Sequence, residues 1–129
     1  MKTIIMDTNF LLIPYQFKVD IFSEIDRIVL ERYELFVLDK TIEELEKIIK
    51  GKGQKQRNKL AATLALQLVR SKNIGILKTE SGKTVDDILL EKADKDTIIA
   101  TQDIELKHSI KQKNCTLIVL RAKKYLILV

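Results

Sequence analysis

The chain has 129 residues, of which 46% are hydrophobic and 32% are charged, and its net charge at neutral pH is +5. This length suffices for one hydrophobic core and is short for two, so we expect one domain over residues 1–129. The composition excludes a disordered chain, and no apolar run approaches the roughly 20 residues of a membrane span. Met1-Lys2-Thr3 leads straight into a short strand without the features of a signal peptide, which favours a cytoplasmic protein with no membrane partner. A single cysteine, Cys115, excludes an internal disulfide.

Short apolar runs alternate with helical periodicity along the chain, which is typical of an α/β protein with a parallel sheet. The first strand is expected at residues 3–6, and the spacing of Ile21, Ile25 and Ile28 predicts a helix after it. The later elements, in chain order, are expected to be a strand at 35–38, helices at 41–50 and 55–70, a strand at 74–77, a helix at 84–94, a strand at 97–100, a helix at 103–112 and a strand at 116–120. Residues 125–128 are expected to add an edge strand or to pair with a second copy of the chain.

Four carboxylates follow strands of this pattern in separate stretches of the chain, namely Asp7, Glu44, Asp86 and Asp103. The carboxyl ends of parallel strands meet at one edge of a sheet, where open α/β folds bind their ligands, so we expect these acids to lie together. Gathered acids repel one another, and divalent cations among them relieve the repulsion. The pattern therefore favours a metal-dependent site that cleaves phosphodiester bonds.

Some of these acids also have a purely structural interpretation. Asp7 could cap the helix that follows the first strand. Thr41 and Glu44 match a capping box, in which a threonine and the glutamate three residues later satisfy the first donors of a helix. If Glu44 serves only as a cap, Glu43 is the alternative ligand. Four acids at four crossovers are nevertheless hard to explain as independent caps.

Helix geometry predicts different roles for the neighbouring residues Asp86 and Asp87. The residues three, four and seven positions after Asp86 are all apolar, whereas those after Asp87 are mostly polar. We therefore expect Asp86 to face inward, and Asp87 to cap the helix start together with Thr84. The same test favours an inward-facing Asp103.

Four segments resemble the successive motifs of the PIN-domain nucleases. The segments are Met6-Asp7-Thr8-Asn9-Phe10-Leu11-Leu12, Glu43-Glu44-Leu45-Glu46, Val85-Asp86-Asp87-Ile88-Leu89 and Ala100-Thr101-Gln102-Asp103-Ile104-Glu105-Leu106. The resemblance runs from residue 1 to about residue 121 and is greatest to small archaeal members near the VapC-type toxins and the nucleases of ribosomal RNA processing. It implies a three-layer α/β/α PIN-like fold with a central parallel sheet.

The resemblance also implies Mg²⁺- or Mn²⁺-dependent cleavage of single-stranded RNA. By position in the motifs, the catalytic metal-binding acids would be Asp7, Glu44, Asp86 and Asp103, the supporting residues would be Asn9 and Thr101, and the lesser ligands would be Asp87 and Glu105. A homodimer is implied as well. A toxin would have a small antitoxin protein as its partner, whereas a processing enzyme would act on ribosomal precursors, which are structured RNA.

Basic residues form separate clusters that would hold an RNA backbone through contacts independent of base sequence. The residues we single out are Lys52, Lys55 and Arg57 in one stretch, Lys107 in a second and Arg121 in a third. The only histidine, His108, lies in a lysine-rich helix and is expected at the surface.

Two other classes of function compete with the nuclease. A catalytically silent RNA-binding or assembly module with the same fold would have lost one of the four acids, and all four are present. A nucleotide-binding α/β domain would have a glycine-rich loop after its first strand, where this chain has Asp7 instead.

Overall fold

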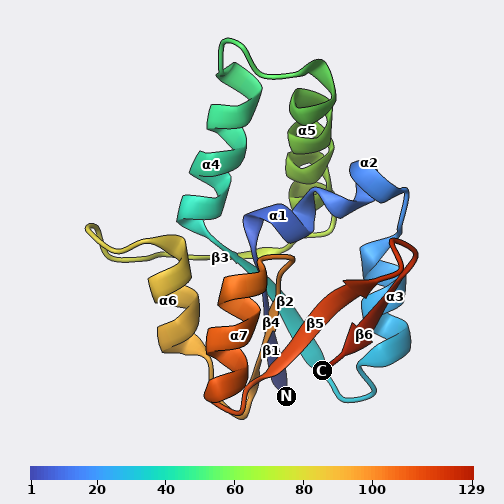
Figure 1. Cartoon of the computed structure of the whole chain (residues 1–129), viewed down its shortest axis with the longest axis vertical. Coiled ribbons are helices and arrows are strands. Elements are labelled where there is room, and N and C mark those ends of the chain that lie inside the picture. The colour runs from blue at the N-terminus through green and yellow to red at the C-terminus, as the bar shows by residue number, and fades with distance from the viewer.

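Six strands form one sheet in the order β3-β2-β1-β4-β5-β6 in the computed structural model, which describes residues 1–129 (Figure 1). The strands are β1 (Lys2–Met6), β2 (Tyr33–Leu38), β3 (Gly75–Leu77), β4 (Thr97–Ala100), β5 (Thr116–Arg121) and β6 (Tyr125–Leu128). The first five are parallel, and β6 pairs antiparallel with β5. The sheet is therefore mixed rather than wholly parallel, and residues 125–128 form the edge strand within the same chain.

Seven helices cover the two faces of this sheet. They are α1 (Thr8–Leu11), α2 (Ile13–Phe17), α3 (Ile21–Ile28), α4 (Asp39–Lys50), α5 (Gln56–Ser71), α6 (Val85–Lys92) and α7 (Ile104–Gln112). The short helices α1 and α2 were not predicted, and α4 begins two residues before the predicted start at residue 41. None of the seven combines the length and the apolar character needed to cross a bilayer.

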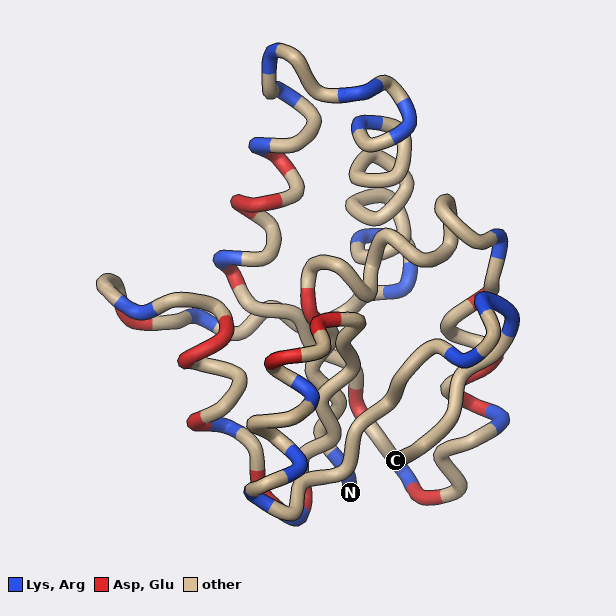
Figure 2. Tube along the Cα trace, viewed as in Figure 1, with Lys and Arg blue, Asp and Glu red and all other residues tan.

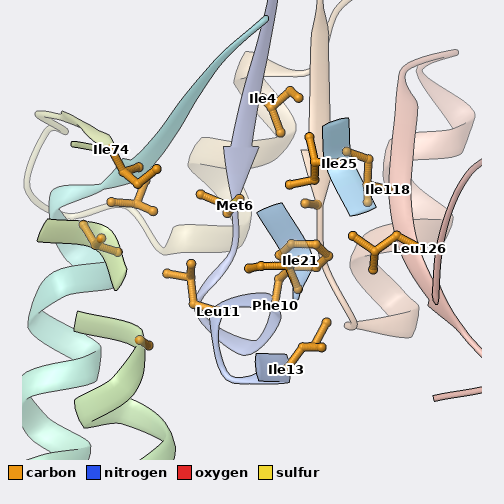
Figure 3. Close-up of a cluster of buried hydrophobic side chains, with 14 of the residues drawn as sticks. Ile4, Met6, Phe10, Leu11, Ile13, Ile21, Ile25, Ile74, Ile118 and Leu126 are labelled. Atoms are coloured by element: carbon orange, nitrogen blue, oxygen red, sulfur yellow. The ribbon is translucent and has the colours of Figure 1, made fainter. Parts of the chain in front are cut away.

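The alternation of side chains along the strands builds a separate core on each face of the sheet. Ile4 and Met6 of β1 point into a core that includes residues of α1 to α5, as Figure 3 shows. Ile5 points the other way, into a core with Leu89 of α6 and Ile110 of α7. The result is three layers, with α1 to α5 on one face and α6 and α7 on the other.

The strand order reverses direction at the centre of the sheet, between β1 and β4. The chain moves outward from β1 through β2 to β3 with helices on one face, and from β4 to β5 with α7 on the opposite face. A switch point of this kind, at the carboxyl ends of the two central strands, is where open α/β folds bind ligands. Asp7 directly follows β1 and Thr101 directly follows β4, so both residues lie at this switch point.

Candidate active site

Asp7 is a buried carboxylate at the end of β1, with only 6% of its surface exposed. Its Oδ2 accepts a hydrogen bond of 2.8 Å from the Thr101 hydroxyl, and its Oδ1 accepts one of 2.8 Å from the backbone N–H of Thr8, which caps α1. Burial raises the pKa of Asp7, the two hydrogen bonds oppose that shift, and the charges of Asp86 and Glu44 add to it. The capping role expected of Asp7 is thus present, and it leaves the carboxylate facing other acids.

The hydroxyl of Thr101 joins the exits of the two central strands. Thr101 is fully buried, and its Oγ1 donates to Asp7 while accepting a hydrogen bond of 3.1 Å from the backbone N–H of Asp103. Asp103 is the N-cap of α7, because its Oδ1 accepts from the N–H of Leu106 at 3.0 Å. One side chain therefore fixes the position of Asp7 relative to the start of α7.

Asn9 ties α1 to the loop after β4. Its Oδ1 accepts from the backbone N–H of Gln102 at 3.1 Å, and its backbone carbonyl accepts from the Gln102 side-chain amide at 3.0 Å. Asn9 has no hydrogen bond with Asp7 itself, and the Thr101 hydroxyl is 3.4 Å from the Asn9 Oδ1. Asn9 thus acts on Asp7 through the loop that contains Thr101.

Glu44 does not form the predicted capping box. Because α4 begins at Asp39, with no side chain capping it, Glu44 lies in the second turn of the helix and Thr41 lies inside the helix. The Oε1 of Glu44 instead accepts a hydrogen bond of 2.7 Å from the hydroxyl of Thr8, which is also 3.3 Å from the Thr41 hydroxyl. Thr8 therefore connects the residue after β1 with the middle of α4. Glu44 and the alternative ligand Glu43 are both exposed, and it is Glu44 that the Thr8 hydroxyl holds.

Asp86 and Asp87 face different surroundings at the start of α6. Asp86, predicted to face inward, is exposed, yet partial desolvation and the charges of Asp103 and Glu44 raise its pKa. The backbone N–H of Asp87 donates to the Thr84 hydroxyl at 3.1 Å, which is the threonine half of the predicted cap. Asp86 is thus the member of the doublet that faces the other acids.

The acids of four different elements share one electrostatic neighbourhood. Asp7 interacts unfavourably with Asp86 and Glu44, and Asp86 with Asp103, Glu44 and Glu105. Figure 2 shows acidic segments on α4, α6 and the start of α7 around the end of β1. This repulsion is the property expected of a site that is completed by a cation.

No three of these side chains are placed so as to hold one metal ion together. Their arrangement does not fit a cation enclosed by protein ligands alone. Mg²⁺ requires fewer protein ligands than such an enclosed site, because it binds through one or two carboxylates and keeps several waters. Oxygen donors without nearby thiolate or imidazole ligands also suit Mn²⁺.

The acid that follows β2, Asp39, was missed as a candidate from the sequence although it stands at a strand exit. Its two carboxylate oxygens accept from the Thr79 hydroxyl at 2.6 Å and from the Thr79 backbone N–H at 3.1 Å. These hydrogen bonds hold the pKa of Asp39 below its ordinary value. Asp39 therefore anchors the segment between β3 and α6 and is not among the repelling acids.

This assignment predicts that Asp39→Asn lowers the melting temperature at pH 7. The pKa of Asp39 is lower in the folded state than in the unfolded state. The charged carboxylate therefore stabilises the fold at neutral pH, and this stabilisation is lost as the pH falls through the unfolded and then the folded pKa. The deficit of the variant should therefore be smaller at pH 3, below the unfolded pKa of about 3.9, than at pH 7. Thermal unfolding at the two pH values measures it, and a deficit independent of pH would contradict the anchoring role of the charge.

The predicted RNA-binding residues lie in two regions of the surface. Lys52, Lys55 and Arg57 are exposed at the turn between α4 and α5, the end of the molecule farthest from the sheet in Figure 2. Lys107 lies on α7 and Arg121 ends β5, and both line one groove. His108, also on α7, is exposed as predicted.

Residues 4–123 match the family described as PIN like domain. The chain belongs to this PIN-like family. It is 33% identical over 127 residues to Ribonuclease VapC4 of Methanocaldococcus jannaschii, which covers 97% of this chain and 95% of that protein. The predicted resemblance to PIN-domain nucleases is thereby confirmed.

Solved structures support the same fold. The structure of the PIN domain endonuclease Utp24 superposes with a TM-score of 0.78 at 22% identity, over 98% of this chain and 90% of that chain. A domain of a functionally unknown protein from M. jannaschii matches with a TM-score of 0.59 at 16% identity, over 95% of this chain and 93% of that chain. The three-layer PIN-like α/β fold predicted from the sequence is confirmed.

Proposed function

We propose that this PIN-like protein is an endoribonuclease that hydrolyses phosphodiester bonds of single-stranded RNA with Mg²⁺ or Mn²⁺. The observation that carries the proposal is the buried carboxylate of Asp7, held by Thr101 and Thr8 at the switch point of the sheet and facing acids from other elements. Identity to a ribonuclease over nearly the whole of both chains supports it. The metal-binding catalytic acids in this proposal are Asp7, Glu44, Asp86 and Asp103, with Asp87 and Glu105 in lesser roles.

The residues of this chain supply position and charge. Hydrogen bonds to both oxygens of Asp7 prevent its carboxylate from turning away, and the Thr8 hydroxyl holds Glu44 toward the same region. Repulsion among these acids raises the affinity for a divalent cation, because binding the cation removes an electrostatic cost. A bound Mg²⁺ or Mn²⁺ supplies an activated water and stabilises the charge on the leaving oxygen.

The biological role within this proposal is that of a VapC-type toxin. It rests on the similarity to Ribonuclease VapC4, whereas the likeness to Utp24 is one of fold and gives no separate support to a role in RNA processing. A toxin role brings with it an antitoxin protein as partner, and the homodimer expected from the sequence belongs to the same proposal. The silent RNA-binding module is the rival, and measurable cleavage would exclude it.

Asp86→Asn and Asp87→Asn form a matched pair for testing the proposal. Each removes one negative charge from the first turn of α6, but only Asp86 faces Asp103 and Glu44. Because a metal contact contributes several kcal/mol of charge stabilisation, Asp86→Asn should lower cleavage about 100-fold or more. Asp87→Asn should stay within about fivefold of wild type, which corresponds to roughly 1 kcal/mol.

Cleavage of end-labelled single-stranded RNA in Mn²⁺ measures both variants, with melting temperatures as the control for folding. Equal losses in the two variants would contradict the assignment of Asp86 to the site. The absence of cleavage by the wild-type protein in Mg²⁺ and in Mn²⁺ would overturn the proposed function.

A further inference from the structure

A groove of about 680 Å³ runs between α7 and the strand β5 and begins beside the candidate active site. Ile104 and Glu105 line its beginning, directly after Asp103, and Lys111 lines it two helical turns farther along. Arg121 contributes from the end of β5, at the edge of the sheet where Asp7 also lies. The groove therefore connects the acidic site to the outer face of α7.

The charge of this groove is opposite to that of the site next to it. Lys107, His108, Lys111 and Arg121 line the groove, and Glu105 is its only acidic side chain. Lys107, Lys111 and Arg121 form no ion pair, since the ion pairs of the protein are Arg27 with Glu24 on α3 and Lys83 with Glu80 and Glu91. Unpaired cations in a groove are available to a polyanion, and neutralising phosphates releases counterions.

The spacing of the lysines follows the axis of the helix. Lys107 and Lys111 come four and eight residues after Asp103, so they lie near the same face of α7 with a rise of about 6 Å for each step. A chain of phosphates placed on these lysines would lead from the groove toward the acids. Arg121 faces the same groove from β5, so the cations stand on both of its walls.

The groove also offers an apolar surface. Ile104, the first residue of α7, is 79% exposed although it is a large apolar side chain, and it lies between Asp103 and Glu105. Leu117 and Val119 of β5 also border the groove, but they are buried, so its exposed apolar side chains are Ile104 and Val129. No aromatic residue lines the groove, so bases or riboses there would pack against aliphatic side chains rather than stack on rings.

We propose that this groove holds a single strand of RNA on one side of the bond that is cleaved. Phosphates of the strand contact Lys107, Lys111 and Arg121, and the nucleotide nearest the acids packs on Ile104. This inference rests on the proposed ribonuclease function and adds to it the path that the bound RNA strand follows away from the acids. It also separates the groove from the basic turn between α4 and α5, which lies on another part of the surface (Figures 1 and 2).

Binding of RNA to a protein that carries Asp7→Asn tests the groove without cleavage. The probe is a fluorescein-labelled RNA of about 12 uridines, within the range of single-strand site sizes, and the readout is anisotropy at several salt concentrations. The groove variant adds Lys107→Gln and Lys111→Gln. The control adds Arg32→Gln and Lys95→Gln, two exposed cations that precede β2 and β4 at the opposite edge of the sheet.

The groove variant should bind the RNA at least about tenfold more weakly, and the slope of log K against log salt should decrease by about 1.4, since each phosphate contact in a single strand contributes about 0.7. The control should keep the slope and the affinity within about twofold. Ile104→Ser should weaken binding without changing the slope, because it removes no charge.

Equal affinities of the groove and control variants would overturn the inference. The inference would also be overturned if the groove variant bound RNA like the control but sedimented with a different mass, because the groove would then be a contact between copies of this chain. Cleavage by the wild-type protein is measured separately. If wild type cleaves RNA but the groove variant binds RNA as well as the control, the nuclease function stands and only the groove assignment is wrong. If wild type cleaves no RNA, the nuclease function is wrong whatever the binding result.

Discussion

Asp7→Asn is expected to lower RNA cleavage by about 1,000-fold or more while leaving the protein at least as stable as wild type in metal-free buffer. The loss of activity follows from removing the most buried of the four acids. Asn keeps the size of the side chain, and the Thr101 hydroxyl has a free lone pair to accept from its amide.

The stability part of this expectation follows from the direction of the pKa shift. The pKa of Asp7 is raised in the folded state, first by burial and also by Asp86 and Glu44. The metal-free protein therefore loses stability as the pH rises from the unfolded pKa through the folded one, because charging the buried carboxylate has a free-energy cost. Asp7→Asn removes that cost, so thermal unfolding in a chelator at pH 7 should show an equal or higher melting temperature. A lower melting temperature with lost activity would mean that Asp7 is mainly structural.

Thr101→Val is expected to lower cleavage by about 10- to 100-fold, the usual cost of removing a residue that orients a metal ligand. The substitution keeps the shape of a fully buried side chain but removes the hydroxyl that donates to Asp7 and accepts from the Asp103 backbone. Because Asp7 then loses an opposing hydrogen bond, its pKa should rise further, and activity should require a higher pH than in wild type.

Thr101→Ser is the matched control for this prediction, because it keeps the hydroxyl and loses only a methyl group. Its rate and its pH profile should return close to those of wild type. A pH profile of Thr101→Val that coincides with that of wild type would contradict the role of the hydroxyl, even if the rate were lower.

The carboxyl ends of the strands were predictable, because each is marked in the sequence by a short apolar run followed by an acidic residue. The run before Asp7 and the run at residues 97–100 are paired neighbours in the sheet, which places their following residues together at the switch point. The position of Asp86 relative to Asp87 followed from the period of the helix, although the actual exposure of Asp86 did not. An apolar stripe sets which way a helix residue faces, whereas its exposure depends on what the neighbouring elements cover.

The helix start at Asp39 and the role of Thr8 were not predictable in the same way. The capping pattern at Thr41 and Glu44 is a local signal, and tertiary contacts favoured a longer helix in which Asp39 anchors Thr79 instead. The hydrogen bond from Thr8 to Glu44 joins residues 36 positions apart. No local pattern encodes such a partner, although the place of Thr8 beside Asp7 was a usable hint.

Titration of the metal-free protein with Mn²⁺, followed by calorimetry, tests the central claim most directly. Wild type should take up Mn²⁺, Asp7→Asn and Asp86→Asn should each weaken that uptake at least about tenfold, and Asp39→Asn should leave it unchanged. Uptake that does not respond to Asp7→Asn, or the absence of uptake at millimolar Mn²⁺, would contradict a cation site among these carboxylates.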